Sequence, residues 1–481
     1  MPITVLGGTK LADTTFSVAN SCRFNAADSS YVHKTQGTST DTDKYTLSVW
    51  LKRGANLGAV NTWFSEGTGL TAQADYNFKA DGTMMIYNRD SSSNIFQLVT
   101  NRVFRDVAAW YHIVVLFDSS QGTAANRMKL YINGVQESSF STATYPAQDL
   151  NSEVNKGGTK HTWAAFDSNG SIVNEFDGYI AEALFLDGTV AAIGDLGEFD
   201  EDSPTIWKPK DVSGLTFGTN GYYLDFEASD NLGNDANGGT DFTEVNVAAA
   251  DQSVDTPTNN FCTLNPLIVP TSNASTFSEG NTKITNSATG WRPGFGTFPV
   301  STGKWYFEVK GLLFPGTSYV QVGWVSLDYV QAGNTAVSDE VNGWGNFDAA
   351  VAYDSRAGKV DYQGGAGTGV YSETSYGDSF TAGDIIGCAL DLDNGKIYFA
   401  EDNTWKNSGD PTSGATGTGA HTVVSGYTWI PYIGINNATA EVTFASPATA
   451  NSSGNADENG YGDFEFAPPS GYLAICSKNT V

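Results

Sequence analysis

Hydrophobic and polar residues alternate along much of the chain with the two-residue period of a β-strand. Residues Tyr45 to Leu51 alternate in this way, while residues Trp110 to Phe117 are apolar on both faces, as in a strand at the centre of a packed sandwich. Residues Lys129 to Val135 place Asn133-Gly134 between two apolar runs, a strong signal for a tight hairpin. No segment has a long 3.6-residue apolar period. The pattern predicts an all-β protein.

The same period returns in the second half of the chain. Trp305, Phe307 and Val309 alternate with polar residues and so share one face of a predicted strand. Residues 384–399 predict a long hairpin that turns at Asn394-Gly395. Regular strands separated by glycine-rich turns are typical of a β-sandwich. We therefore predict two antiparallel β-sandwiches of jelly-roll type in tandem.

The boundaries follow from changes in composition. Between Asp195 and Asp255 the chain has fourteen acidic residues against two lysines, and glycine and asparagine crowd residues 231–239. This composition predicts an acidic, Gly/Asn-rich connector between the sandwiches. The expected order is an N-terminal arm (1–19), the first sandwich (20–228), the connector (229–260), the second sandwich (261–447) and a C-terminal extension (448–481).

The net charge of the chain limits the kinds of molecule that it can bind. The chain has 481 residues, with 53 acidic and 25 basic residues and a net charge of −28. Such a surface repels phosphate backbones and anionic lipid, so we expect neither nucleic-acid binding nor membrane insertion. We expect no cofactor, although the surplus carboxylates leave Ca²⁺ binding open. The N-terminus lacks a basic start followed by an apolar run, which predicts no secretory signal, and no stretch approaches the ~18–20 apolar residues of a membrane span.

Both halves resemble known families. The first resembles the laminin-G-like, concanavalin A-type domain found in phage and marine viral proteins, through residues 20–34, 47–54, 110–114, 130–134 and 176–180. The second is similar to a SPRY (B30.2-type) domain, through residues 303–309, 322–324 and 391–399. The resemblance implies two variants of the concanavalin A-like sandwich. It also implies a binding role for the second, because SPRY domains recognise partners through their loops and are not enzymes.

No recognisable catalytic or metal-binding set appears in the sequence. Asp225 and Glu227 have the spacing of carboxylates that share a strand face, but they are only two carboxylates and a surface role explains them better. Asp391 and Asp393 flank a predicted turn, where aspartate caps backbone N–H groups. The four histidines lie far apart and form no metal-ligand motif, and His112 is expected to fill a satisfied position inside a strand.

Aromatic residues are better candidates for binding, because aromatic side chains give large, rigid contact surfaces with a polar handle. Trp344, Trp405, Trp63 and Trp163 occur in glycine- or asparagine-rich surroundings that look like loops. We take these four as candidate glycan-binding residues, with Trp344 first. A second set of tryptophans lies within predicted strands and is expected in the core: Trp50, Trp110, Trp305 and Trp324.

These observations favour a non-enzymatic structural or accessory protein of a virus particle, in the tail, a fibre or the capsid surface, assembled in the host cytoplasm. Its expected partners are other virion proteins, further copies of itself (a trimer would suit a fibre) and host-surface polysaccharide. The alternative is a virion-associated polysaccharide depolymerase, a glycoside hydrolase or lyase on the same scaffold. A bacterial surface adhesin is disfavoured by the absence of a predicted secretory signal.

Overall fold

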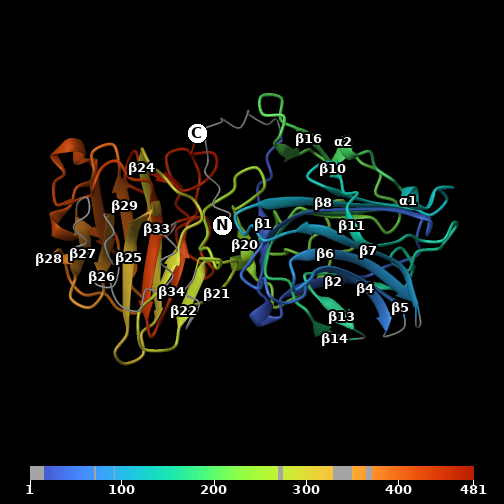
Figure 1. The fold of residues 1–481 in the computed structure, drawn as a ribbon, viewed down its shortest axis with the longest axis horizontal. Coiled ribbons are helices and arrows are strands. Elements are labelled where there is room, and N and C mark those ends of the chain that lie inside the picture. Colours follow the sequence, from blue (N-terminus) through green and yellow to red (C-terminus); the bar gives the residue numbers. More distant parts are fainter. Residues whose placement is uncertain are drawn as a thin grey trace. The chain divides into compact units, whose positions relative to one another are not determined.

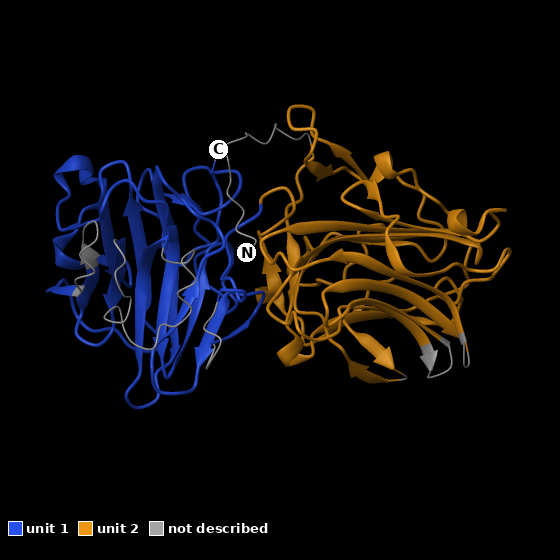
Figure 2. Ribbon diagram, viewed as in Figure 1, with its two compact units in different colours: residues 1–9, 260–481 blue, residues 10–259 orange. Residues whose placement is uncertain are grey.

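The computed structural model describes residues 16–69, 72–90, 93–168, 170–268, 275–328, 349–364 and 371–480. The chain divides into two compact units, residues 10–259 and residues 260–481, which we call the first and second modules (Figure 2). Strands dominate both modules, and the helices named among the described residues are short (Figure 1). The all-β prediction is therefore confirmed.

The first module is built from two large antiparallel sheets. Sheet 1 contains, in spatial order, β10 (Val135–Gln136), β9 (Met128–Ile132), β8 (Trp110–Asp118), β3 (Lys44–Arg53), β15 (Gly178–Asp187), β1 (Ser21–Phe24) and β20 (Gln252–Ser253), and β18 (Tyr222–Leu224) also pairs with β15. Sheet 2 contains β11 (Phe140–Thr144), β7 (Ser93–Val103), β6 (Thr83–Asp90), β5 (Ala72–Phe78), β4 (Asn61–Gly69), β12 (Lys160–Trp163), β2 (Tyr31–Thr35) and β19 (Thr243–Val245).

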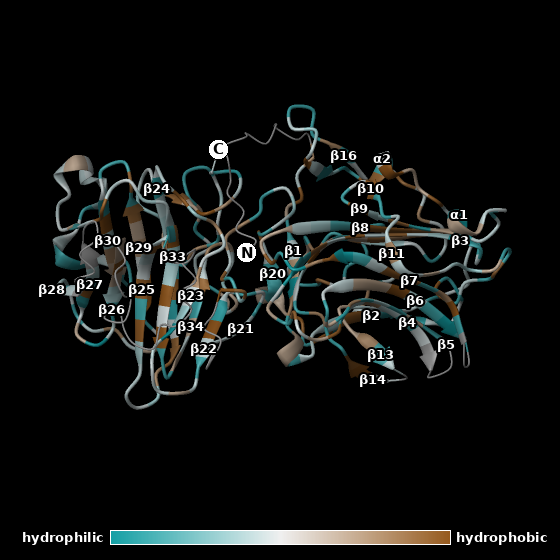
Figure 3. Ribbon diagram, viewed as in Figure 1, coloured by the Kyte–Doolittle hydropathy of each residue, from teal (hydrophilic) through white to brown (hydrophobic). Residues whose placement is uncertain are grey.

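Smaller elements complete the first module. They are the pairs β13 (Phe166–Ser168) with β14 (Ser171–Val173) and β16 (Gly197–Phe199) with β17 (Trp207–Pro209), the helical turns α1 (Ala124–Arg127) and α2 (Ile193–Leu196), and the 3₁₀ turns η1 (Ala26–Asp28) and η2 (Ala249–Asp251). Figure 3 colours each residue of the strands by its hydropathy. Because alternate residues of a strand share a face, the apolar positions of both sheets meet in one core. The predicted hairpin at Asn133-Gly134 is confirmed: both residues have positive φ, 49° and 75°, as a type I′ turn requires.

The predicted acidic connector is wrong. Residues 229–259 belong to the first module, where β19 pairs with β2 and β20 pairs with β1. Leu232 and Phe242 are buried in its core. The acidic side chains of this segment bind backbone N–H groups: Asp235 accepts hydrogen bonds from those of Tyr223, on β18, and of Asn237, within the segment. Acidic and asparagine residues therefore hold tight turns here, where their composition suggested a loose linker.

The second module has a larger and a smaller sheet. Sheet 3 contains β21 (Thr276–Ser278), β22 (Lys283–Asn286), β34 (Ala438–Thr443), β24 (Lys304–Leu313), β29 (Ile385–Asp391), β30 (Lys396–Glu401) and β31 (Thr404–Trp405), with β32 (His421–Thr422) paired to β30 and β35 (Leu473–Ala474) to β24. Sheet 4 contains β23 (Arg292–Phe295), β33 (Trp429–Asn436), β25 (Tyr319–Ser326), β26 (Ala349–Asp354), β27 (Lys359–Gly364) and β28 (Tyr371–Ser375). The 3₁₀ turns η4 (Lys406–Ser408) and η5 (Pro411–Thr416) follow β31.

The C-terminal extension, residues 448–480, packs onto sheet 3 as part of the second module. Strand β35 runs parallel to β24, and the Phe464 ring meets the Tyr306 ring edge-on, with 5.3 Å between centroids. Buried carboxylates hold the segment: Glu308 accepts the N–H groups of Glu465 and Phe466, and Glu441 accepts that of Thr449. The extension therefore completes the sandwich. Within the described residues, no helix is long and apolar enough to cross a membrane.

Candidate functional site

A row of hydrogen-bonding side chains crosses the outer face of sheet 2. Cross-strand pairing places one residue from each strand in register, in the order Thr243, His33, Thr162, Ser65, Asp75, Tyr87, Gln97 and Thr144. Their neighbours along the strands, such as Tyr76, Ile86 and Leu98, are buried in the core. Because alternate residues point to opposite faces, the row lies on the face turned away from the core. The sheet therefore has one apolar and one polar face.

Asp75 occupies the middle of this row. Its side chain is 5% exposed, and its Oδ1 accepts a hydrogen bond from Thr62 Oγ1 at 2.8 Å. Burial raises the pKa of Asp75 to about 6, although the nearby Asn77 amide and the Thr62 hydroxyl lower it. Beside Asp75, Gln73 Nε2 donates to the Tyr87 hydroxyl at 3.1 Å. Burial and the Asp75 carboxylate also raise the pKa of Tyr87, so this phenol stays protonated at neutral pH.

Two half-buried members of the row, Tyr87 and Gln97, lie on β6 and β7. Residues of β6 alternate between buried and half-buried, and Met85, Tyr87 and Arg89 are the half-buried set next to Gln97 of β7. We call Met85, Tyr87, Arg89 and Gln97 the β6 patch. It combines an aromatic ring, an amide and a guanidinium group on one rigid sheet face. A flat ring with hydrogen-bonding groups beside it is the chemistry that recognises a sugar ring.

The hairpin β13–β14 covers the neighbouring part of the row, over β4. Ser65 Oγ donates to the Ala165 carbonyl at 2.8 Å, and the Asp167 N–H donates to Ser65 Oγ at 3.2 Å. Lys160 Nζ lies 2.9 Å from Asp167 Oδ2 on the same face. Among the described residues, the buried Thr162 hydroxyl has no hydrogen-bond partner. The hairpin and the sheet thus enclose a polar layer beside the β6 patch.

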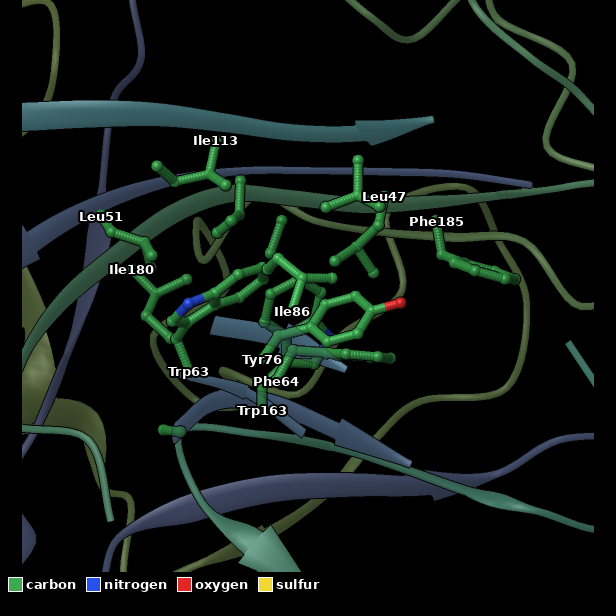
Figure 4. Close-up of a cluster of buried hydrophobic side chains, with 14 of the residues drawn as sticks. Leu47, Leu51, Trp63, Phe64, Tyr76, Ile86, Ile113, Trp163, Ile180 and Phe185 are labelled. Atoms are coloured by element: carbon green, nitrogen blue, oxygen red, sulfur yellow. The ribbon is translucent and has the colours of Figure 1, made fainter. Parts of the chain in front are cut away.

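Two of the predicted binding tryptophans lie in the core. Trp63 on β4 and Trp163 on β12 are 0% exposed, with 6.4 Å between ring centroids (Figure 4). Trp163 Nε1 donates to the Tyr222 hydroxyl at 3.1 Å. Their prediction as loop residues that bind ligand was wrong, because both lie within strands whose alternate residues, such as Thr62, Ser65 and Thr162, face away from the core.

The other two candidates have different outcomes. Trp405 lies on β31, is half-buried and meets the Tyr398 ring edge-on, with 6.4 Å between centroids. It stays a candidate. Trp344, the first choice from sequence, lies outside the described residues. Trp50, Trp110, Trp305 and Trp324 are all less than 9% exposed, which confirms that they belong to the core.

The acidic pair considered for hydrolysis does not share a strand face. Strand β18 ends at Leu224, and Phe226 has a φ of 59°, so the chain turns between Asp225 and Glu227. Asp225 Oδ1 accepts the Glu227 N–H at 3.1 Å, which is a turn contact. The nearby Glu182 is 5% exposed and accepts the Tyr223 hydroxyl at 2.6 Å, and burial raises its pKa to about 8.

The remaining sequence candidates have structural roles. Asp391 accepts the Asn394 N–H at 3.0 Å, as predicted for a turn cap, whereas Asp393 accepts the N–H of Gly303, which is remote in sequence, at 2.8 Å. His112 is satisfied on both ring nitrogens, by Ser48 Oγ and Trp207 Nε1, each at 2.8 Å. Burial lowers its pKa to about 3. Across the described residues, no group of three or more His, Cys, Asp or Glu side chains is placed to hold a metal ion.

Comparisons with known proteins match each module to a domain family. Residues 25–192 match the family model of the concanavalin A-like lectin/glucanases superfamily, and residues 304–446 match that of the SPRY domain. The chain thus carries a concanavalin A-like lectin/glucanase domain followed by a SPRY domain, as the sequence predicted. The β6 patch lies inside the first matched region. No curated protein matches the chain.

Solved structures with these folds are distant in sequence. A human SPRY domain is 16% identical, covers 36% of this chain and 94% of its own, and has a TM-score of 0.24. Domains LG4-5 of the mouse laminin alpha1 chain are 11% identical and have a TM-score of 0.30. The match covers 88% of this chain and 85% of the laminin chain. The CBM40 of a Ruminococcus gnavus IT-sialidase, solved with alpha2,3 sialyllactose, is 14% identical and has a TM-score of 0.26. The match covers 38% of this chain and 97% of the CBM40 chain.

Sequence reasoning missed the β6 patch, although its signal was present. Residues 72–78 and 83–90 place polar side chains at alternate positions, including Gln73, Asp75 and Asn77. The alternation predicts a polar face on each strand. The partners across the sheet depend on strand order, which the sequence does not specify.

Proposed function

We propose that this protein is a non-enzymatic binding protein of a virus particle, and that its first module binds host-surface polysaccharide through the β6 patch. The observation that carries the proposal is the in-register arrangement of Asp75, Tyr87 and Gln97 on the outer face of sheet 2. Gln73 fixes the Tyr87 hydroxyl, so the ring is held in place before a ligand arrives. Fixing the ring in advance lowers the entropic cost of binding.

Each element of the patch has a distinct role in this proposal. Tyr87 offers a ring face to the apolar side of a pyranose. Gln97 and Arg89 supply an amide and a guanidinium for sugar hydroxyl groups. Asp75 is nearly buried and acts as a positioning residue through its neighbour Tyr87. A single patch of this size binds weakly, and many copies on one particle multiply weak contacts into useful avidity.

The assignment to a virus particle rests on the resemblance of the first module to viral laminin-G-like domains. Its other proposed partners are neighbouring virion proteins and further copies of this chain. Mass spectrometry of purified virus particles tests the assignment. A fixed copy number in the particle supports it, and the number separates a many-copy capsid component from a few-copy tail or fibre component. Absence from particles, with the chain present in infected cells, contradicts it.

Binding to an array of bacterial oligosaccharides tests the polysaccharide proposal. We expect Tyr87→Ala and Gln97→Ala to reduce binding at least tenfold. Tyr131→Ala is the matched control, because Tyr131 is a half-buried tyrosine on β9 of sheet 1. Equal loss in the control, or full binding by Tyr87→Ala, would refute the site.

The alternative function is a polysaccharide depolymerase. One observation favours it: the raised pKa of Asp75 would suit a general acid. Hydrolysis by paired carboxylates also needs a second carboxylate roughly 5–10 Å away across the substrate. On this face the Asp167 carboxylate is paired with Lys160, which disfavours that role. Release of reducing sugar by the wild type and its loss in Asp75→Asn would establish the enzyme and overturn the non-enzymatic proposal.

A further inference from the structure

Lys52 and Asp255 form an ion pair that is closed off from solvent. Lys52 Nζ lies 2.6 Å from Asp255 Oδ2, and both side chains are 1% exposed. By comparison, Lys34 and Asp235 lie 3.4 Å apart, and the Lys34 side chain is 11% exposed. Lys52 belongs to β3, whereas Asp255 follows β20, 203 residues further along the chain. The pair therefore joins two segments of the first module that are remote in sequence.

Neighbouring groups hold the Asp255 carboxyl group in one orientation. The Trp110 indole Nε1 donates to Asp255 Oδ1 at 3.1 Å, and the Lys52 ammonium donates to Oδ2. The backbone of Asp255 is held as well, because Ser21 Oγ donates to its carbonyl at 2.6 Å and its N–H donates to Ser253 Oγ at 3.2 Å. The lysine nitrogen and the carboxyl group are thus fixed in contact, with little freedom to separate.

Burial changes the relative stability of the ion pair and of the amide that the same two groups can form. Two charges removed from water lose hydration that their mutual attraction offsets only in part. Condensation to an amide removes both charges and releases one water molecule. Groups that a fold holds in contact also react as if their concentration were on the order of 10⁵ M or more. Both effects favour the amide over the ion pair at this position.

We propose that Lys52 and Asp255 condense into an isopeptide bond, with the ion pair as its precursor. One proton passes from the Lys52 ammonium to Asp255 Oδ2 along the hydrogen bond that joins them. The free electron pair of Nζ then attacks Cγ, while the Trp110 N–H stabilises the negative charge that develops on Oδ1. The Nζ–Cγ bond forms, a second proton moves from Nζ to Oδ2, and the Cγ–Oδ2 bond breaks. Oδ2 leaves as water, so no further reactant is needed.

The bond closes a covalent loop around most of the first module. Every strand from β4 to β20 lies between Lys52 and Asp255. A cross-link that closes a long loop lowers the entropy of the unfolded chain and so stabilises the folded state. The cross-link requires no ligand and involves no residue of the β6 patch. This proposal and the polysaccharide proposal can therefore fail separately.

Mass spectrometry of the intact, denatured full chain tests the proposal. We expect most molecules to be lighter than the sequence mass by one water molecule. Digestion should release a branched peptide in which Lys52 is joined to Asp255. The ion pair of Lys304 and Asp391 is an internal control, because Lys304 is 24% exposed and should give no branched peptide. A full sequence mass in fresh protein and after prolonged storage at neutral pH would overturn the proposal.

Two variants separate this bond from other losses of water. Lys52→Arg keeps the positive charge, but a guanidinium group is not deprotonated in proteins and cannot attack the carboxyl group. We expect this variant to keep its full mass. Lys34→Arg is the matched control and should lose water as the wild type does. Loss of water that persists in Lys52→Arg, or that occurs without the branched peptide, contradicts the proposal. The branched peptide is sought in the wild type, so the test holds even if Lys52→Arg misfolds.

Discussion

Asp75 Oδ1 accepts a hydrogen bond from Thr62 Oγ1 at 2.8 Å, while the same residue pairs directly with Tyr87 on the next strand. The contact joins β4, β5 and β6 on the outer face of sheet 2. It places a nearly buried carboxyl group beside the half-buried ring of Tyr87. The stability and the proposed binding of the first module therefore depend on the same residue.

The protonation of Asp75 predicts a pH dependence. The folded state raises its pKa from 3.8 to about 6, so the folded protein binds the proton more tightly than the unfolded chain does. The stability from this group is present below pH 4 and is lost as pH rises to 6. We expect the wild type to lose about 3 kcal/mol relative to Asp75→Asn over that range, since one pKa unit is 1.36 kcal/mol. Urea unfolding at several pH values measures the difference, and parallel curves would contradict it.

The core position of Trp63 predicts a large effect on stability. Trp63→Ala should destabilise the first module by about 3–5 kcal/mol, because it leaves a cavity beside Trp163. Trp405→Ala removes a half-buried ring and should cost less than about 2 kcal/mol. Thermal unfolding of the two variants measures the stability that each substitution costs. Similar costs for both variants would mean that Trp63 is not a core residue.

A buried ion pair holds the end of the first module. Lys52 Nζ lies 2.6 Å from Asp255 Oδ2, both side chains are 1% exposed, and Trp110 Nε1 donates to Asp255 Oδ1 at 3.1 Å. Lys52→Met leaves the carboxylate without its cation and should cost about 3–5 kcal/mol. Adding Asp255→Asn should recover part of that cost, because the amide still accepts the Trp110 N–H. A double-mutant cycle in urea tests this, and strictly additive effects would contradict the coupling.

The hydrogen bonds that Glu308 accepts predict how fast the C-terminal segment exchanges its amide hydrogens. Burial raises its pKa to about 7, and its oxygens accept the N–H groups of Glu465 and Phe466, both at 2.9 Å. Glu308→Ala removes both acceptors, so residues 448–466 should exchange amide hydrogens faster while β25 and β33 stay protected. Glu308→Gln keeps one acceptor oxygen and should give an intermediate rate. Exchange at the wild-type rate in Glu308→Ala would show that other contacts hold the segment.

The sequence predicted the fold in detail where local chemistry determines it. The Asn133-Gly134 turn needs two residues with positive φ, and few other pairs adopt that conformation readily. The alternation at Trp305 to Val309 placed the core residues of β24 correctly. These signals come from neighbours along the chain, so no tertiary information was needed.

Prediction from the sequence failed where a residue's role depends on how the strands pair. Trp63 and Trp163 have loop-like neighbours, and only the pairing of β4 with β12 places both rings in one core. The acidic residues of 229–259 suggested a linker because the sequence alone does not show which backbone N–H groups they bind. These partners, such as Tyr223, lie elsewhere in the chain or depend on the geometry of a turn. Asp75 and Tyr87 became neighbours only when β5 and β6 paired. Binding faces made of alternate residues on several strands require the strand order.

Amide hydrogen exchange with and without a bound oligosaccharide tests the central claim most directly. The oligosaccharide should be the strongest binder from the array. We predict slower exchange in the peptides that cover β5, β6 and β7, and the same exchange as the free protein in the second module. Protection confined to other strands, or no protection at a saturating concentration, would contradict the assignment of polysaccharide binding to the β6 patch.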